Sequence, residues 1–332
     1  MRALVTGTSG FVGGALGGYL RRRGWHVTGV SRRPARPGAV DVSLPHDLSR
    51  SPPPVRDAPD VVVHAAALSS PWGPPAAFER ANVAGTRHVL DLARRHPGTH
   101  LVLISSSSVL YREGDQLGVR EDEPPPPRAV NAYAQTKLRA EELVRGHTGP
   151  WTILRPRAVY GVGDTVLFPR LARAARLRLL PHLTRADGVE PVGDLVSIDN
   201  LVRLAARAIE GRATGTLHLT DGAPVPIRAF VDDALAGVGL PGASFRVGVP
   251  AAMRLAGVLE GLSRRTGWWE PPLTRYGVSV FARSKTFDTA RAVAALGAPD
   301  VPTDVALRRF TAWWRAGASL DDPAMGRVGE PA

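Results

Sequence analysis

Short apolar runs of strand length alternate with helical apolar patterns along most of the chain. The strand-like runs lie at 3–6, 26–30, 60–68, 101–104, 151–155 and 216–219. The runs at 60–68 and 101–104 are almost continuously apolar, which is typical of strands buried on both faces of a parallel sheet. Helical spacing of apolar residues follows several runs, for example over 12–20, 82–95 and 199–209. This alternation predicts the α/β class, with a Rossmann-type, doubly wound parallel sheet.

The strict alternation is interrupted over 165–190 and again beyond 222, where no regular strands separate the helical patterns. We therefore expect two lobes. A dinucleotide-binding domain covers 1–164, and residues 191–222 return to it. A smaller, mostly helical substrate-binding lobe is formed by 165–190 and 223–332. Because these segments interleave, no single linker marks a boundary between the lobes.

A glycine-rich turn joins the first strand to the first helix. Gly7, Gly10 and Gly13 follow the strand at a G-x-x-G-x-x-G spacing, and a helical apolar face begins beside them. Such a turn directs unpaired backbone N–H groups and the positive end of the helix dipole at a pyrophosphate. A glycine-rich hairpin would not account for the helical face. The turn thus predicts a dinucleotide site with contacts from Gly7, Ser9, Gly10, Phe11, Val12 and Gly13.

The end of the second strand bears on the choice of cofactor. In dinucleotide-binding folds an acidic residue there accepts a hydrogen bond from the 2′-OH of NAD, whereas arginines accommodate the 2′-phosphate of NADP. This chain has Ser31, Arg32 and Arg33 there, and no acidic residue before Asp41. We therefore expect NADP(H) to be favoured over NAD(H), although arginine is abundant throughout the chain.

Two motifs suggest acid–base chemistry. Tyr133 and Lys137 stand four residues apart in a helical pattern, so both side chains lie on one face. A phenol ordinarily has a pKa near ~10. An ammonium about 4 Å away would favour the phenolate by roughly 4 kcal/mol at an effective dielectric constant of ~20, which makes the tyrosine a usable acid or base. Ser105–Ser108 follow the run 101–104, at the sheet edge where ligands bind, and we expect one serine to contact the substrate oxygen.

Composition excludes several other kinds of site. The chain has no Cys, and its nine His show no metal-ligand spacing, so we expect no metal site. The net charge of +12 comes almost wholly from arginine, since only two of 42 cationic residues are lysines. Because the arginine clusters lack interleaved aromatic residues, nucleic acid is not an expected partner. No apolar run could span a bilayer and the first strand begins at residue 3, so we expect a cytoplasmic protein with a small-molecule substrate; a homodimer stays open.

Taken together, these motifs resemble the extended short-chain dehydrogenase/reductase family, within the NAD-dependent epimerase/dehydratase superfamily. Further segments match its motifs: His64-Ala65-Ala66, Asn82-Val83-Ala84-Gly85-Thr86, Leu154-Arg155-Pro156, Val159-Tyr160-Gly161 and Val196-Ser197-Ile198-Asp199-Asn200. The resemblance implies that Tyr133 is the general acid and that Lys137 tunes it and holds the ribose. By the family's register Ser107 is the catalytic serine, with Ser106 the alternative. Further cofactor contacts are implied at Asp47, Leu48, Ala65, Ala66, Ala67, Asn82, Tyr133, Lys137, Pro156 and Val159.

Two departures from the family's patterns bear on the substrate. Sugar-nucleotide dehydratases carry Asp-Glu after the serine, where this chain has Ser108-Val109, and sugar-nucleotide epimerases carry Asn where it has Ala158. The segments 155–170 and 272–288 resemble instead the 3β-hydroxysteroid dehydrogenase-like branch, which interconverts alcohols and ketones on large apolar substrates. The resemblance therefore implies an NADPH-dependent ketoreductase acting on a steroid-, polyketide- or β-keto acid-like substrate. A sugar-nucleotide epimerase or dehydratase and a non-catalytic dinucleotide sensor remain the alternatives.

Overall fold

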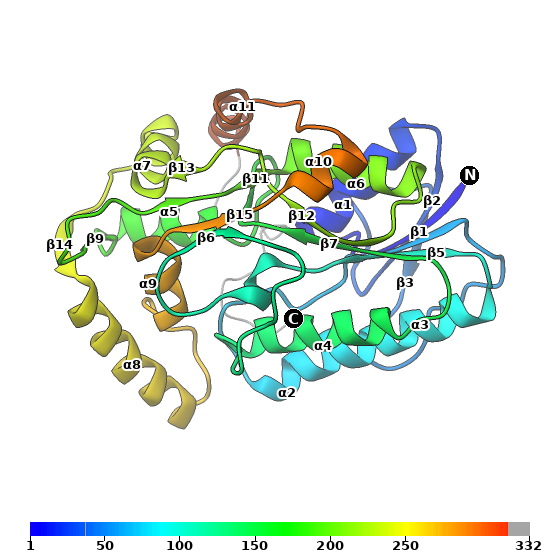
Figure 1. The fold of residues 1–332 in the computed structure, drawn as a ribbon, viewed down its shortest axis with the longest axis horizontal. Coiled ribbons are helices and arrows are strands. Elements are labelled where there is room, and N and C mark those ends of the chain that lie inside the picture. Colours follow the sequence, from blue (N-terminus) through cyan, green and yellow to red (C-terminus); the bar gives the residue numbers. More distant parts are fainter. Residues whose placement is uncertain (37, 318–332) are drawn as a thin grey trace.

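A seven-stranded parallel sheet forms the centre of the computed structural model, which describes residues 1–36 and 38–317 (Figure 1). Its strand order is β12-β7-β5-β4-β1-β2-β3, and every neighbouring pair is parallel. The strands are β1 (Arg2–Thr6), β2 (His26–Ser31), β3 (Val42–Pro45), β4 (Val61–His64), β5 (His100–Ile104), β7 (Trp151–Pro156) and β12 (Gly215–Leu219). This sheet confirms the Rossmann-type α/β fold. The strand β4 is shorter than the run 60–68 predicts, because residues 65–68 form a loop beyond its end.

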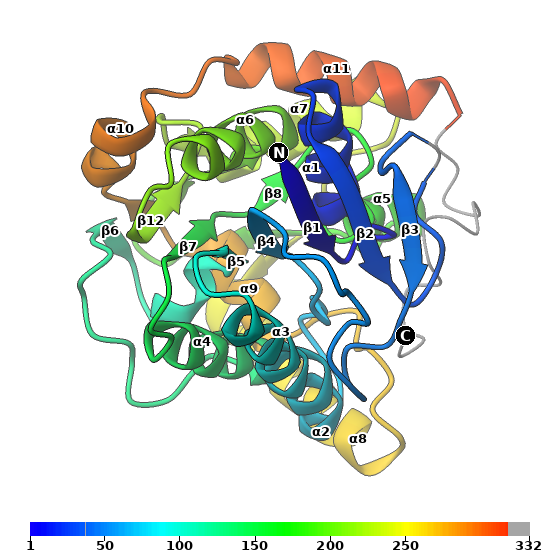
Figure 2. The same cartoon turned by 90° about the vertical axis from the view of Figure 1, so that its right-hand side faces the viewer.

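Helices cover both faces of the sheet (Figure 2). One face carries α1 (Phe11–Arg22), α6 (Ile198–Glu210) and α10 (Ala290–Leu296). The other face carries α3 (Gly85–Arg95) and α4 (Ala132–Arg145). The short helix α2 (Pro75–Phe78) and the π-helical turn η1 (Glu79–Ala84) lead into α3. Strand side chains alternate between the two layers: Val5 of β1 packs in the cluster with α1 and α6, and Leu4 in the cluster with α3 and α4. Because both faces are buried, the strands read as continuous apolar runs.

The smaller lobe combines helices with short strand pairs. Its helices are α5 (Phe168–Arg176), α7 (Ile227–Gly237), α8 (Val249–Arg265), α9 (Arg275–Ala282) and α11 (Thr303–Arg315), and β9 (Pro181–Thr184) pairs with β14 (Phe245–Gly248). A mixed four-stranded sheet of order β13-β10-β15-β6 contains β6 (Gln116–Val119), β10 (Val192–Gly193), β13 (Val225–Pro226) and β15 (Lys285–Phe287). Three short elements complete the fold of the described residues. The 3₁₀ turn η2 (Ser107–Leu110) follows β5, and β8 (Val159–Tyr160) pairs with β11 (Val196–Ser197).

Two contacts in the structure cross the expected division into lobes, which itself stays a prediction. The strand β6 comes from 1–164 but pairs with β15, so the two lobes share a sheet. Ala292 and Leu296 of α10 pack into the core beside α1 and α6, although 223–332 is the segment expected in the smaller lobe. The strand β12 and helix α6, from 191–222, belong to the central sheet and its covering layer. The last part of the expected lobe, 318–332, lies outside the described residues.

The strand order places a ligand crevice at the carboxyl end of β1. This strand lies between β2 and β4, so the chain leaves the centre of the sheet in opposite directions on its two sides. Open α/β sheets bind their ligands at such a switch point. The glycine turn after β1, the loop after β4, the serines after β5 and the end of β7 all meet at this edge.

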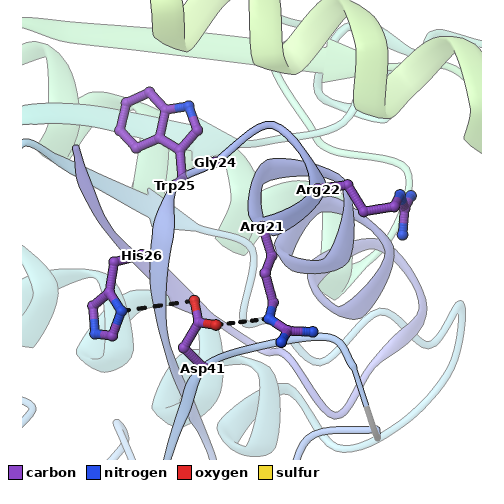
Figure 3. A pocket seen from close by; sticks show the side chains of 6 residues that line it. All are labelled: Arg21, Arg22, Gly24, Trp25, His26 and Asp41. Atoms are coloured by element: carbon purple, nitrogen blue, oxygen red, sulfur yellow. Dashed lines mark hydrogen bonds and ion pairs between the residues drawn. The ribbon is translucent and has the colours of Figure 1, made fainter.

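A shallow surface hollow lies at the opposite end of the strands (Figure 3). Its lining consists of Arg21, Arg22, Gly24, Trp25, His26 and Asp41. Asp41 accepts hydrogen bonds from Val27 N (2.8 Å) and from Nε of Arg21 (2.7 Å), and these bonds hold the pKa of its carboxyl below the ordinary value. These contacts fasten the end of α1 to β2, so the hollow is a structural junction remote from the crevice.

Within 1–36 and 38–317, no helix is long and apolar enough to cross a membrane. The same residues include no group of three or more His, Asp or Glu side chains arranged to hold a metal ion.

Candidate active site and cofactor crevice

The turn between β1 and α1 has the close packing that its glycine spacing predicts. Gly7 has φ +77°, and a Cβ added there would lie 2.8 Å from Cα and N of Ala66. A Cβ on Gly13 would lie 2.4 Å from the carbonyl oxygen of Gly7. No side chain among the described residues caps the start of α1, so the first N–H groups of this helix can bind an anion. The cradle therefore fits the pyrophosphate of a dinucleotide, at the turn that holds Ser9, Gly10, Phe11 and Val12.

The loop after β4 is held against this turn. The Thr6 hydroxyl accepts a hydrogen bond from Ala66 N (3.0 Å) and lies 2.9 Å from Nδ1 of His64. Burial lowers the pKa of His64 to about 3, so this imidazole is neutral and has a structural role. The loop Ala65–Ala67 consequently lies beside Gly7, at the edge where a dinucleotide would bind.

Asn82 supports this loop from the turn η1. Its Oδ1 accepts a hydrogen bond from Leu68 N (2.7 Å), and its Nδ2 donates to Leu68 O (3.3 Å) and to Oγ1 of Thr136 in α4 (3.0 Å). The residue is buried, and these bonds occupy its amide. A π-helical turn at this point is typical of a functional site. The structure thus gives the Asn82 side chain a bracing role, and the cofactor contact that the resemblance implies stays a prediction.

The carboxyl end of β2 presents two cations. Arg32 and Arg33 are exposed, and the buried Ser31 hydroxyl donates to Arg33 O (2.7 Å), which fixes the backbone of the turn. Burial acts to raise the pKa of Asp47, but hydrogen bonds and the charge of Arg32 outweigh it and hold the pKa below its ordinary value. Leu48 is buried in the core below this corner. The structure therefore brings Arg32 and Asp47 together, as an adenosine-binding corner requires.

Pro156 and Val159 complete the expected cofactor contacts. Pro156 ends β7 at the same sheet edge, and the half-buried Val159 begins β8. Between them Ala158 has φ +42°, in the left-handed region that Asn tolerates better than Ala. By the family resemblance, Ala158 is the position at which sugar-nucleotide epimerases carry Asn, and this chain has no amide there.

Tyr133 and Lys137 lie one turn apart near the start of α4. The helix is capped by Asn131, whose Oδ1 accepts a hydrogen bond from Ala134 N (2.8 Å). Tyr133 is half-buried, whereas Lys137 is only 2% exposed. Nζ of Lys137 donates to the carbonyl oxygen of Ile104 (2.6 Å), the last residue of β5. Both candidate catalytic groups therefore stand at the carboxyl edge of the sheet.

The phenol of Tyr133 is protonated at neutral pH. Burial raises its pKa to about 12, although a hydrogen bond with the Ser106 hydroxyl acts to lower it. The lowering by Lys137 that the helical spacing predicts is not found, because the ammonium is held by a backbone carbonyl. Tyr133 is thus arranged as a proton donor in this structure.

Each of the first three serines after β5 has a different partner. Ser105 donates to Oε1 of Glu141 (2.5 Å), Ser106 caps the turn η2 by accepting from Ser108 N (3.2 Å), and Ser107 lies close enough to Tyr111 to act on the pKa of its phenol. Adjacent side chains diverge because the chain turns sharply as η2 begins. Ser106 in turn acts on the pKa of Tyr133, whereas the family's register gives Ser107 as the catalytic serine, so the assignment of that serine stays a prediction.

A buried ion pair lies beneath Lys137. Nε and Nη2 of Arg155 donate to the two carboxylate oxygens of Glu141, at 2.9 and 2.7 Å. Burial acts to raise the pKa of Glu141, but the hydrogen bond from Arg155 outweighs it, so the carboxylate stays charged. Burial lowers the pKa of Lys137 to about 8, and the Glu141 charge acts in the opposite direction. Glu141 thus helps to keep the lysine protonated.

This geometry agrees with the comparison of the chain with known protein families. Residues 3–218 match the model described as the NAD dependent epimerase/dehydratase family. The chain belongs to this family. The match confirms the resemblance drawn from the motifs and, at the level of the family, dinucleotide binding.

Curated relatives add the type of chemistry. The chain is 33% identical to 2-alkyl-3-oxoalkanoate reductase of Stenotrophomonas maltophilia, over 94% of the chain and 99% of that protein. It is 28% identical to the sterol-4-alpha-carboxylate 3-dehydrogenase, decarboxylating, of Homo sapiens, over 71% of the chain and 66% of that protein. These relatives confirm the expectation of an NAD(P)-dependent oxidoreductase acting on CH–OH or C=O groups.

Among solved structures, the UDP-glucuronic acid 4-epimerase from Bacillus cereus in complex with NAD is similar, with a TM-score of 0.68. The two chains share 20% identity, and the alignment covers 95% of this chain and 99% of the epimerase. At this identity the likeness shows the fold alone.

The sequence motifs assign no role to three further side chains near the candidate site, those of Tyr111, Arg157 and Tyr276. The rings of Tyr111 and Tyr276 stack with their centroids 6.2 Å apart. The guanidinium carbon of Arg157 lies 5.2 Å from the centroid of the Tyr111 ring. The phenols of Tyr111 and Tyr133 are close enough to the buried phenol of Tyr276 to influence its pKa. Since Tyr276 lies on α9, the smaller lobe supplies one wall of the site.

Proposed function

We propose that the protein is an NADPH-dependent ketoreductase that converts a ketone on a large apolar substrate into a secondary alcohol. The observation that supports this most directly is the place of Tyr133 and Lys137, one helical turn apart at the same sheet edge as the glycine cradle. The phenol is protonated at neutral pH and can therefore act as a proton donor. A proton donor suits reduction, because the carbonyl oxygen must gain a proton as the carbon gains a hydride.

Each residue of the site has its own role in this reduction. NADPH, when bound, supplies the hydride. Tyr133 donates its phenolic proton to the carbonyl oxygen, and the hydroxyl of Ser106 or Ser107 donates a hydrogen bond to the same oxygen. The ammonium of Lys137 holds the ribose hydroxyls of the bound cofactor. The balance is one ketone, one NADPH and one proton, giving one secondary alcohol and NADP⁺.

The relatives support a reductase over the alternatives. The Stenotrophomonas maltophilia protein, named a 2-alkyl-3-oxoalkanoate reductase, aligns along nearly its whole length. A sugar-nucleotide epimerase or dehydratase is less well supported, since Ala158 and Ser108-Val109 replace the residues that those enzymes use. A non-catalytic sensor would have no use for a tyrosine, a lysine and a serine gathered at one edge.

Turnover of ketones tests the proposal. In the presence of NADPH and a panel of steroid ketones, polyketide-like ketones and β-keto acids, we expect NADPH absorbance to fall and the matching alcohol to form in equal amount. Mass spectrometry identifies the alcohol, and UDP-sugars serve as the comparison substrates. Isomerisation of a UDP-sugar without net NADPH consumption, together with inertness toward every ketone, would show that the protein is an epimerase.

The exposed pair Arg32 and Arg33 is expected to make NADPH bind more tightly than NADH. Replacing both by Ala should weaken NADPH binding by about tenfold or more, the worth of a charged hydrogen bond, and leave NADH nearly unchanged. Quenching of tryptophan fluorescence measures both affinities. The matched control is Arg87→Ala, which removes an exposed arginine from α3. Equal affinities of the unmodified protein for the two cofactors would contradict the preference.

A further inference from the structure

Arg157 is a buried cation without a carboxylate partner. The residue is 3% exposed and directly follows β7. Two residues earlier, Arg155 forms a bidentate ion pair with Glu141. In contrast, Nε of Arg157 finds no hydrogen-bond partner among residues 1–36 and 38–317, and its guanidinium lies within ion-pair distance of no carboxylate in that part of the chain.

The surroundings of Arg157 give its guanidinium no ion-paired carboxylate within the described residues. Lys285 is a second buried cation near the same ring, with Nζ 5.5 Å from the centroid of Tyr111, but Gln116 and two backbone carbonyls occupy its ammonium. The carboxylate that acts on Arg157 is Asp194, which accepts a hydrogen bond from a backbone N–H of β15 (2.6 Å). Asp194 acts on Arg157 and Asp115 acts on Lys285, but neither carboxylate forms an ion pair with these cations, so a further anion is favoured here.

Arg157 belongs to an aromatic cluster that reaches the candidate acid. Its guanidinium lies over Tyr111, whose ring is stacked on that of Tyr276. Tyr276 in turn interacts with both Arg157 and Tyr133. Because Tyr276 comes from the smaller lobe, this cluster lies away from the glycine cradle. A charge at this place would meet the substrate near the carbonyl that Tyr133 protonates.

Burying an unpaired guanidinium is unfavourable unless something completes its hydrogen bonds. The cation–π contact with Tyr111 offsets only part of that cost. A carboxylate is the group that best matches the planar fork of a guanidinium, since it can accept two parallel hydrogen bonds.

We propose that Arg157 binds a carboxylate of the substrate next to the ketone, so that the preferred substrates are 3-oxo acids rather than their neutral derivatives. This inference rests on the proposed ketoreductase function. It assigns Arg157 a role in specificity, separate from the proton transfer by Tyr133.

The test compares 3-oxodecanoate with the nearly isosteric but neutral 3-oxodecanamide, using the unmodified protein and NADPH. We expect kcat/KM to be about 10²-fold higher for the acid, chiefly through a lower KM. Arg157→Gln should remove this preference, because it lowers kcat/KM far more for the acid than for the amide. The control Arg128→Gln removes an exposed arginine from the loop before α4 and should keep the preference.

A second measurement does not depend on the folding of a variant. Decanoate should compete with the substrate of the unmodified protein, whereas decanol should compete at least about tenfold more weakly. Equal kcat/KM for the acid and the amide, or equal inhibition by decanoate and decanol, would overturn the carboxylate site and leave the ketoreductase intact. Turnover of steroid ketones but of neither decanoyl compound would overturn it in the same way. Inertness toward every ketone would overturn both the carboxylate site and the ketoreductase.

Discussion

Tyr133→Phe is expected to lower the rate of ketone reduction by about 10²–10⁴-fold, the usual worth of a positioned general acid. The phenylalanine ring preserves the packing near the start of α4 but removes the proton donor. Cofactor affinity should barely change, because the phenol is directed at the substrate and the cradle lies on β1 and α1. The measurements are a single-turnover rate and an NADPH affinity for the same preparation.

Two comparisons sharpen this test. Tyr19→Phe removes a phenol on α1, far from the carboxyl edge of β5, and should leave the rate unchanged. Tyr111 and Tyr276 are the other phenols near the site. Near-normal turnover of Tyr133→Phe, combined with a large loss in Tyr276→Phe, would show that the smaller lobe supplies the proton instead.

Lys137→Met is expected to reduce both NADPH affinity and the single-turnover rate, because the ammonium holds the ribose and thereby positions the nicotinamide beside the substrate. The pH dependence should report the same group. The active form is the ammonium, and its pKa is lowered to about 8 by burial. The rate should therefore be constant below pH 8 and fall about tenfold for each further pH unit.

Glu141→Gln is expected to shift the alkaline limb of this pH–rate profile, and the electrostatics predict the direction of the shift. The Glu141 charge acts to raise the pKa of Lys137, so its removal should shift the alkaline limb to lower pH. The exposed neighbour offers a matched control: Glu142→Gln should leave the limb in place. Because Glu141→Gln also leaves Arg155 without its carboxylate, the position of the limb is the informative quantity and the absolute rate is not. An unmoved limb would mean that another group titrates.

The fold could be predicted from the sequence because each of its signals is local. Continuous apolar runs mark strands that are buried on both faces, and the glycine spacing marks a turn in which a Cβ at Gly13 would strike the carbonyl of Gly7. The Tyr133–Lys137 spacing similarly follows from one helical turn. The predicted length of β4 was wrong. Ala65–Ala67 continue the apolar run in the sequence, but they form a loop that is hydrogen-bonded to the Thr6 side chain.

The rest of the site depends on tertiary contacts that the spacing of apolar residues along the sequence does not predict. The hydroxyls of Ser106 and Ser107 reach different partners because a 3₁₀ turn begins between them. Tyr276 meets Tyr111 only through the packing of α9 against the central domain. Arg157 looks in the sequence like one more arginine among many, and only its burial without a carboxylate sets it apart from Arg155.

The strand order β12-β7-β5 also has a consequence for synthesis of the chain on the ribosome. The edge of β7 has no partner until Gly215–Leu219 has emerged, and by then residues 165–190 of the other lobe have already been made. Ala292 and Leu296 join the core beside α1 later still. The nucleotide-binding half therefore cannot finish folding as an early, independent unit, and the growing chain carries an open sheet edge of the kind that chaperones protect.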